Sequence, residues 1–279
     1  MSESFDQGPG RAALETAAEE DRLDAAGFVA LGKARLDADD IDGAARAFET
    51  AIDDAANGAD AETRAVAHGH LGVIAEMRDQ WEAAEAQYEI SLRISEINGR
   101  KEGAAFTRMM LAELSLRKRN FEAGADHAQR ALDLYAELQD KTGRAAAYGT
   151  LGIAAKHQGA PLAAQAHFRR ALMLCEAAGD TVGMGVALCH LGKLATDLEE
   201  YEKAAAYLDA ARALDGKTGR KDGFAQTEAA LGVLAHKRGD TAEACRRWSA
   251  AASIFIDLGA ADEARRILHL MKSTGCPLH

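Results

Sequence analysis

Apolar residues along this chain recur with the three-to-four-residue spacing of amphipathic helices, and no stretch shows the alternation typical of a β-strand. Ala is the dominant apolar residue, and only Pro9, Pro161 and Pro277 could interrupt long helices. A core built on Ala requires backbones that approach closely, which suits helices packed on helices. The pattern therefore predicts an all-α fold.

The helical pattern repeats every 40 residues, without an insertion or deletion, over six copies. Each copy contains a Leu-small pair, which reads Leu31-Gly32, Leu71-Gly72, Leu111-Ala112, Leu151-Gly152, Leu191-Gly192 and Leu231-Gly232. Sixteen residues after the small residue comes a bulky column that reads Phe48, Tyr88, Ala128, Phe168, Leu208 and Trp248. Small residues recur on either side of that column, at Ala44 and Ala51 in the first copy. A fixed period of this length predicts stacked helical hairpins.

The period also predicts where the helices begin and end. First helices are expected near 24–38, 61–78, 101–118, 141–158, 181–198 and 221–238, and second helices near 41–56, 81–98, 121–138, 161–178, 201–218 and 241–258. Residues 1–22 are expected to hold a disordered start (1–10) and a capping segment (11–22), residues 23–260 six repeats, and residues 261–279 a capping helix (261–273) and tail. Gly99, Gly179, Gly219 and Gly259 occupy the left-handed position that ends a helix, with Gln139 as the exception in that column.

Glycine in a helix interior costs about 0.8–1 kcal/mol relative to Ala, so the Leu-Gly column needs a compensating contact. A missing side chain allows two helix axes to approach to about 8 Å. We therefore expect the small residues of the second helix to face each glycine, with the bulky residue filling the gap beside them.

These columns resemble the tetratricopeptide repeat (TPR) family over about residues 24–258. The long period is similar to the repeats of the LGN/Pins polarity scaffolds and of bacterial TPR signalling regulators. The resemblance implies a right-handed α-solenoid whose first helices line a concave groove that binds a peptide or a partner segment. The chain departs from the scaffolds, which often have Asn before Leu-Gly, because it has Ala30, His70, Met110, Thr150, His190 and Ala230 there. The carboxylate clamp of chaperone-binding relatives is not recognisable either, so both of those ligand classes are disfavoured.

By resemblance, groove residues lie six, three and two positions before the conserved small residue, and one, four and five after it. Helical spacing supports this, because these offsets form one stripe. In repeats one to three the stripe includes Val29, Lys33, Val66, Val73, Glu76, Met77, Phe106, Met109, Met110, Glu113 and Arg117. In repeats four to six it includes Lys156, His157, His190, Lys193, Asp197, His236 and Lys237. The stripe is apolar in the first half and mildly basic in the second.

We hypothesise a ligand segment whose apolar anchors meet Phe106, Met109 and Met110, and whose acidic part lies along Lys156, Lys193 and Lys237. The alternative for Phe106 and Met109 is that they join neighbouring first helices. The alternative for the lysines is an ordinary solvated surface.

The formal charge of −11 argues against nucleic acid as a partner, because phosphate binding requires clustered Lys and Arg. No run approaches the length of a membrane span, and residues 1–10 lack the apolar core of a signal peptide. Four irregularly spaced cysteines, Cys175, Cys189, Cys245 and Cys276, are expected to be free thiols in a reducing cytoplasm.

Motifs that would indicate an enzyme are missing from the sequence. There is no HExxH or CxxC pair, no nucleophile elbow, and no P-loop, since Gly183-Met184-Gly185 lacks a third glycine and a preceding strand. We therefore predict no catalytic residues, no metal and no cofactor.

Two classes of function remain open. The first is a non-enzymatic adaptor or scaffold that binds an unidentified protein or peptide in the groove. The alternative is a peptide- or ligand-responsive regulator that acts through a separate output partner. Self-association through an uncovered end of the array stays open in both.

Overall fold

The computed structural model describes residues 23–58 and 60–277, and within them the secondary structure is helical, without a strand. The chain divides into two compact units, Met1–Leu114 and Ser115–His279, called unit 1 and unit 2 below. The expected disordered start and N-terminal capping segment lie outside the described residues.

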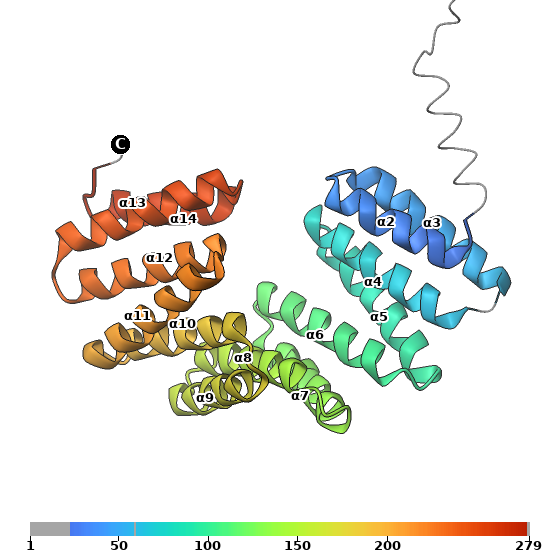
Figure 1. Cartoon of the computed structure of the whole chain (residues 1–279), viewed down its shortest axis with the longest axis horizontal. Helices are drawn as coiled ribbons and strands as arrows, with labels where there is room; N and C mark the ends of the chain where they lie inside the picture. Colours follow the sequence, from blue (N-terminus) through green and yellow to red (C-terminus); the bar gives the residue numbers. More distant parts are fainter. Residues whose placement is uncertain (1–22, 59, 278–279) are drawn as a thin grey trace, which may run out of the picture. The chain divides into compact units, whose positions relative to one another are not determined.

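The described residues of unit 1 form four complete helices and most of a fifth (Figure 1). These are α2 (Ala25–Asp37), α3 (Ile41–Gly58), α4 (Ala61–Met77), α5 (Trp81–Ile97) and α6 (Lys101–Arg117), whose last three residues belong to unit 2.

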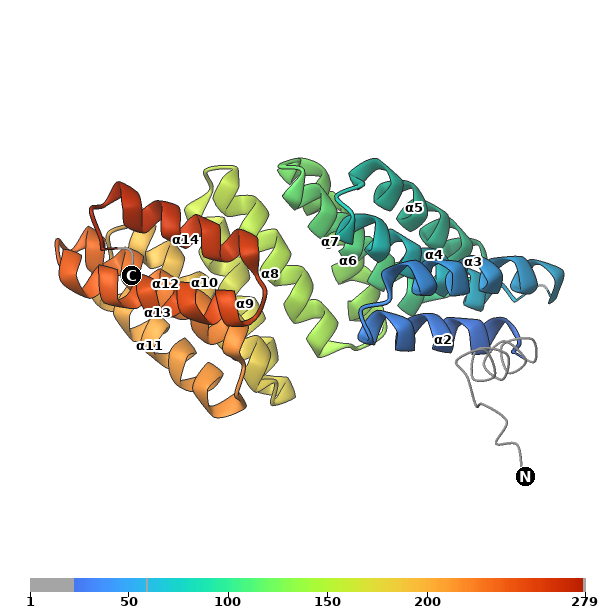
Figure 2. The same cartoon turned by 90° about the horizontal axis from the view of Figure 1, so that it is seen from above.

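Unit 2 contains α7 (Phe121–Glu137), α8 (Lys141–His157), α9 (Pro161–Ala178), α10 (Thr181–Asp197), α11 (Tyr201–Thr218), α12 (Lys221–Lys237), α13 (Thr241–Asp257) and α14 (Ala261–Ser273) (Figures 1 and 2). All these bounds lie close to the ranges expected from the 40-residue period.

Consecutive helices pair as antiparallel hairpins. The most extensive contacts join α2 to α3, α4 to α5, α8 to α9, α10 to α11 and α12 to α13, and each hairpin also packs on the next one in its unit. Each unit is therefore a stack of TPR-like hairpins, and the fold is an all-α solenoid.

The conserved glycines lie against the bulky column, which corrects one detail of the sequence-based expectation. A Cβ atom placed on Gly152 would lie 2.4 Å from Cε1 of Phe168, and one on Gly232 would lie 2.5 Å from Cδ1 of Trp248. The same holds for Gly32 with Phe48, Gly72 with Tyr88 and Gly192 with Leu208. The large side chain itself occupies the space of the missing Cβ, and at Gly192 the backbone oxygen of the small residue Ala204 also lies 3.4 Å from that point.

Helix ends follow the period as well. Pro161 is the first residue of α9, where its missing N–H costs no hydrogen bond. Gly99, Gly179, Gly219 and Gly259 adopt the left-handed conformation with φ between 66° and 71°, as predicted. Gln139 adopts it too, at φ 56°, so the backbone keeps the turn even where the sequence departs from glycine.

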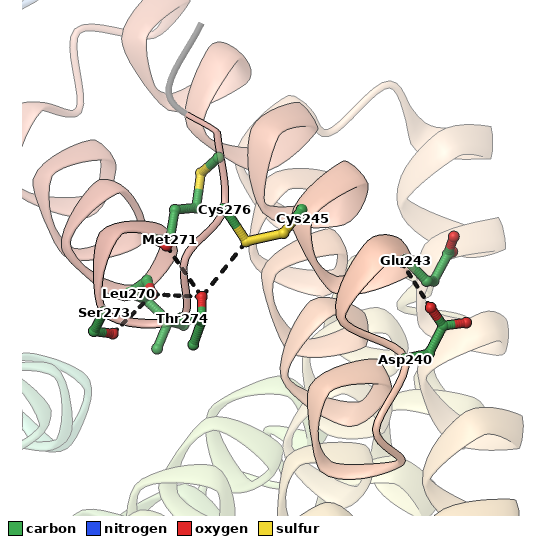
Figure 3. The surroundings of a disulfide bond; sticks show 8 residues. All are labelled: Asp240, Glu243, Cys245, Leu270, Met271, Ser273, Thr274 and Cys276. Carbon is green, nitrogen blue, oxygen red and sulfur yellow. Dashed lines mark hydrogen bonds between the residues drawn. A yellow bond between two sulfur atoms is a disulfide. The ribbon is translucent and has the colours of Figure 1, made fainter.

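A disulfide joins Cys245 of α13 to Cys276, which follows α14, with 5.4 Å between their Cα atoms (Figure 3). The expectation of four free thiols is therefore wrong for this pair, while Cys175 and Cys189 are free and buried. Disulfides persist in oxidising compartments, so the cysteines no longer support a cytoplasmic location.

Candidate functional site

The candidate site is the surface presented by the first helix of each hairpin, called the first-helix face below. In unit 1 it is formed by α2, α4 and the unit 1 part of α6. In unit 2 it is formed by α8, α10 and α12, and the terminal helix α14 takes the corresponding place after α13. Each unit carries one pocket on this face that the described residues define well.

The unit 1 pocket has a volume of about 320 Å³. It is lined by Lys33, Ala65, Val66, Gly69, His70, Val73, Ser91, Ser95, Gly103, Phe106 and Thr107. Its apolar residues are accessible, because Phe106 is 55% exposed and Val66 is 37% exposed. These two side chains and Val73 were predicted groove residues, and the structure brings them together.

Buried hydroxyl groups form the polar part of this pocket. Ser91 Oγ donates a hydrogen bond to the carbonyl oxygen of Ala65 at 2.7 Å and lies 3.2 Å from Thr107 Oγ1. Because these hydroxyls bond to the protein, they fix the packing of α5 against α4 and α6 and leave the apolar residues as the open part of the pocket.

The unit 2 pocket is larger, about 470 Å³. It is lined by Lys156, Lys193, Thr196, Asp197, Gln226, Ala229, Ala230, Val233, Phe255, Glu263, Arg266 and Ile267. Lys156 and Lys193 were predicted groove residues and lie here together. The α13 and α14 residues were missed, although Arg266 has the same −6 offset in the period as Val66 and Phe106.

Most charges of the unit 2 pocket are paired. Lys156 Nζ lies 2.7 Å from Asp197 Oδ2, and a guanidinium nitrogen of Arg266 lies 2.8 Å from Glu263 Oε1. Lys193 forms no ion pair or hydrogen bond with any described residue. One uncompensated ammonium group therefore lines a pocket that also holds the apolar residues Val233, Phe255 and Ile267.

The other predicted groove residues lie outside the two pockets. Met77 is 55% exposed, and Glu113, Arg117, His157 and Lys237 are also exposed. Met110 is half-buried, whereas Met109 is only 4% exposed. The buried position of Met109 agrees with the packing alternative and corrects its assignment as an accessible anchor.

Three predicted or neighbouring histidines stack on aromatic rings of second helices. His70 stacks on Phe48 at 4.8 Å between ring centroids, His190 on Phe168 at 5.0 Å and His157 on Phe121 at 4.5 Å. Burial, reinforced by Lys33, lowers the pKa of His70 to about 4. Burial, reinforced by Lys193 and Lys156, lowers the pKa of His190 to about 3. Both rings are therefore neutral at physiological pH and act as packing surfaces.

The free thiol of Cys175 is buried and held in its protonated form. Burial, together with Asp180 and Glu176, raises the pKa of Cys175 to about 11, which keeps this thiol protonated. Within the described residues, no three His, Cys, Asp or Glu side chains are arranged to hold a metal ion. None of the helices in the described part combines the length and apolar character that a membrane crossing demands.

Comparisons with known proteins support the fold. No protein-family model matches the chain, and no curated protein matches it in sequence. Among solved structures, the apo form of RapI aligns with a TM-score of 0.70 and 14% identity over 90% of this chain and 97% of that chain. A Rap protein complexed with competence and sporulation factor aligns with a TM-score of 0.65 and 16% identity over 92% and 78% of the two chains.

The TPR-like repeats of a kinesin light chain from Podosopora anserina align with a TM-score of 0.56 and 14% identity over 69% of this chain and 95% of that chain. At these identities the likeness concerns the fold alone. The chain has a TPR-like helical-repeat fold, and the closer resemblance to LGN/Pins repeats stays a prediction.

Proposed function

We propose that this chain is a non-enzymatic interaction module that binds a partner peptide or helix on its first-helix face. The observation that carries the proposal is the unit 1 pocket, where Phe106, Val66 and Val73 are gathered at the surface around buried hydroxyl groups. Accessible aromatic residues in pockets are typical of binding hot spots. Full burial of one such side chain contributes about 1.5–3 kcal/mol.

The chemistry of the described residues supports a binding role over a catalytic one. His70 and His190 are stacked and neutral, and the Cys175 thiol is buried and protonated. A binding surface requires only exposed contact area, which Phe106 and Val66 supply. The formal charge of −11 supports a protein or peptide partner over nucleic acid.

The proposal is tested by affinity capture from a lysate of the native host. The groove variant carries Phe106→Ala and Val66→Ala. The matched control carries Ile97→Ala, because Ile97 is an apolar residue of the same unit that is 78% exposed but lies outside the pocket. Circular dichroism first establishes that both variants fold.

We expect the groove variant to capture at least about tenfold less of a partner protein than the wild type does, and the Ile97→Ala control to capture the same amount as the wild type. Equal capture by all three proteins would contradict the proposal. An equal loss in both variants would also contradict it, because the partner would then not depend on the pocket.

The second candidate function is a ligand-responsive regulator with a separate output partner. The 470 Å³ pocket of unit 2 favours it, because that volume falls in the range of small-molecule sites. Successive repeats contact only their neighbours, so a ligand that rotates two hairpins changes the dimensions of the array. Small-angle scattering with and without ligand tests this, since an unchanged curve at saturation would argue for the adaptor.

A further inference from the structure

The two pockets occupy equivalent places in the repeat, four periods apart. Nine of the eleven residues that line the unit 1 pocket have their counterpart, 160 residues later, in the lining of the unit 2 pocket. Lys33 corresponds to Lys193 and Val73 to Val233. The repeat geometry therefore builds this pocket, from three consecutive first helices and one second helix.

The two pockets keep the lysine and the valine but differ in the residues around them. Lys33, like Lys193, forms no ion pair with any described residue. In unit 1 the neighbouring positions hold His70 and Ser95, whereas unit 2 has Ala230 and Phe255 in their place. The unit 2 pocket is thus larger and has apolar side chains at these two positions, while Gln226 and Arg266 replace the apolar Val66 and Phe106 of unit 1.

Charge complementarity then defines what fits the unit 2 pocket. The charges cancel within each of the ion pairs Lys156–Asp197 and Arg266–Glu263, which leaves the ammonium group of Lys193 as the uncompensated charge. The amide of Gln226 adds a hydrogen-bond donor on the same wall. We propose that this pocket binds a small carboxylic acid with an apolar body, whose carboxylate pairs with Lys193 and whose apolar part lies on Val233, Phe255 and Ile267.

The wall contributed by α14 is held in place covalently. Ile267 and Arg266 belong to this terminal helix, whose only fully buried residues within the described chain are Ala264 and Met271. The Cys245–Cys276 disulfide ties the end of α14 back to α13 (Figure 3). A preorganised wall lowers the cost of ordering the site when a ligand binds.

This inference rests on the proposed function in one respect, that the first-helix face is a binding surface. It differs in the occupant, which is a small molecule in unit 2, whereas the protein partner is assigned to the pocket of unit 1. Loss of protein capture in the Phe106→Ala and Val66→Ala variant leaves the small-molecule test unaffected, so the two ideas fail separately.

The test is isothermal titration calorimetry of the oxidised full chain with octanoate, with octan-1-ol as the uncharged probe and acetate as the probe without an apolar body. Lys193→Met removes the charge but keeps an apolar stem of similar length. Lys193→Arg retains the charge. Lys221→Met is the matched control, because Lys221 is exposed on α12 but lies outside the pocket.

We expect saturable octanoate binding that weakens about tenfold or more in Lys193→Met, because a hydrogen bond to a charged group is lost. Binding should be largely retained in Lys193→Arg and unchanged in Lys221→Met, while octan-1-ol binds the wild type and Lys193→Met alike. Acetate should bind far more weakly than octanoate.

Three results would overturn the proposal. The first is a wild type that shows no saturable binding of octanoate. The second is an equal loss of octanoate affinity in Lys193→Met and Lys221→Met. The third is binding of a short acidic peptide, such as acetyl-Leu-Glu-Leu-amide, in place of octanoate, which would assign the pocket to a peptide side chain.

Discussion

The contact between Gly152 of α8 and Phe168 of α9 gives the sharpest prediction about stability. A methyl group added at Gly152 would lie 2.4 Å from Cε1 and 2.6 Å from Cδ1 of a ring that is 1% exposed. Carbon atoms prefer separations of about 3.5–4.0 Å, so the ring would have to move by about 1 Å. The same ring stacks on His190, and any shift disturbs that contact as well.

The magnitude follows from two opposing effects. Ala is better than Gly in a helix interior by about 0.8–1 kcal/mol, whereas overpacking of a filled core costs about 1–3 kcal/mol. Gly149 lies on the same helix, and a Cβ there meets nothing within 4 Å. Gly149→Ala should therefore raise the free energy of unfolding by roughly 0.5–1 kcal/mol. The free energy of unfolding of Gly152→Ala should be about 1–3 kcal/mol lower than that of Gly149→Ala.

The assay is urea unfolding followed by circular dichroism, with the two variants compared at equal m-value. A second background tests the cause. Phe168→Ala alone should cost about 3–5 kcal/mol, but in that background Gly152→Ala should become stabilising, because the ring is gone. If Gly152→Ala stabilises the wild type as much as Gly149→Ala does, the account of the glycine column is wrong.

Two further predictions concern the C-terminal disulfide and the buried histidines. Cys276→Ser opens a loop closed across 31 residues, so the free energy of unfolding of the segment that contains α14 should fall by about 3–4 kcal/mol. The rate of backbone hydrogen exchange in α14 should then rise strongly, and an unchanged rate would refute this. The pKa values of His70 and His190, about 4 and about 3, lie below the unfolded value of 6.5, so protonation favours the unfolded chain. The stability that the two neutral rings contribute is therefore fully present above pH 6.5 and is lost as the pH falls from 6.5 towards 3. Urea midpoints between pH 7 and pH 4 should decline less in a His70→Gln, His190→Gln double variant, and an identical decline would show that other groups control it.

Much of the fold follows from the period, because every helix end lies at a repeated position. The left-handed glycines at positions 99, 179, 219 and 259 and Pro161 at the start of α9 illustrate this. The direction in which the glycines face was harder to predict. A glycine shows that something approaches closely, but the sequence does not tell whether a small residue or a ring does so.

The candidate site was predictable only in part. The offsets located Phe106, Val66 and Lys193, since one helical stripe faces one side. The prediction of Met109 as an accessible anchor failed because its position, three before the small residue Ala112, lies towards the edge of that stripe. Small residues there, Gly69 and Ala229, leave a pocket open, whereas the long side chain of Met109 is itself buried.

The disulfide had no sequence signal. Cys245 lies in the sixth repeat and Cys276 in the tail beyond the repeats, at a spacing that matches no motif, and only the turn after α14 brings their Cα atoms within 5.4 Å. Cysteine spacing predicts pairing when a short chain has a dense framework, and this chain has only four cysteines among 279 residues.

The central claim, that the first-helix face binds the partner, is tested most directly by photo-crosslinking. A photoreactive phenylalanine analogue is placed at Phe106 in one protein and at Ile97 in another, because both side chains are exposed in unit 1 but only Phe106 lines the pocket. We predict that a partner from the host lysate is crosslinked at Phe106 and not at Ile97. Crosslinking at Ile97, or equally at both positions, would contradict the claim.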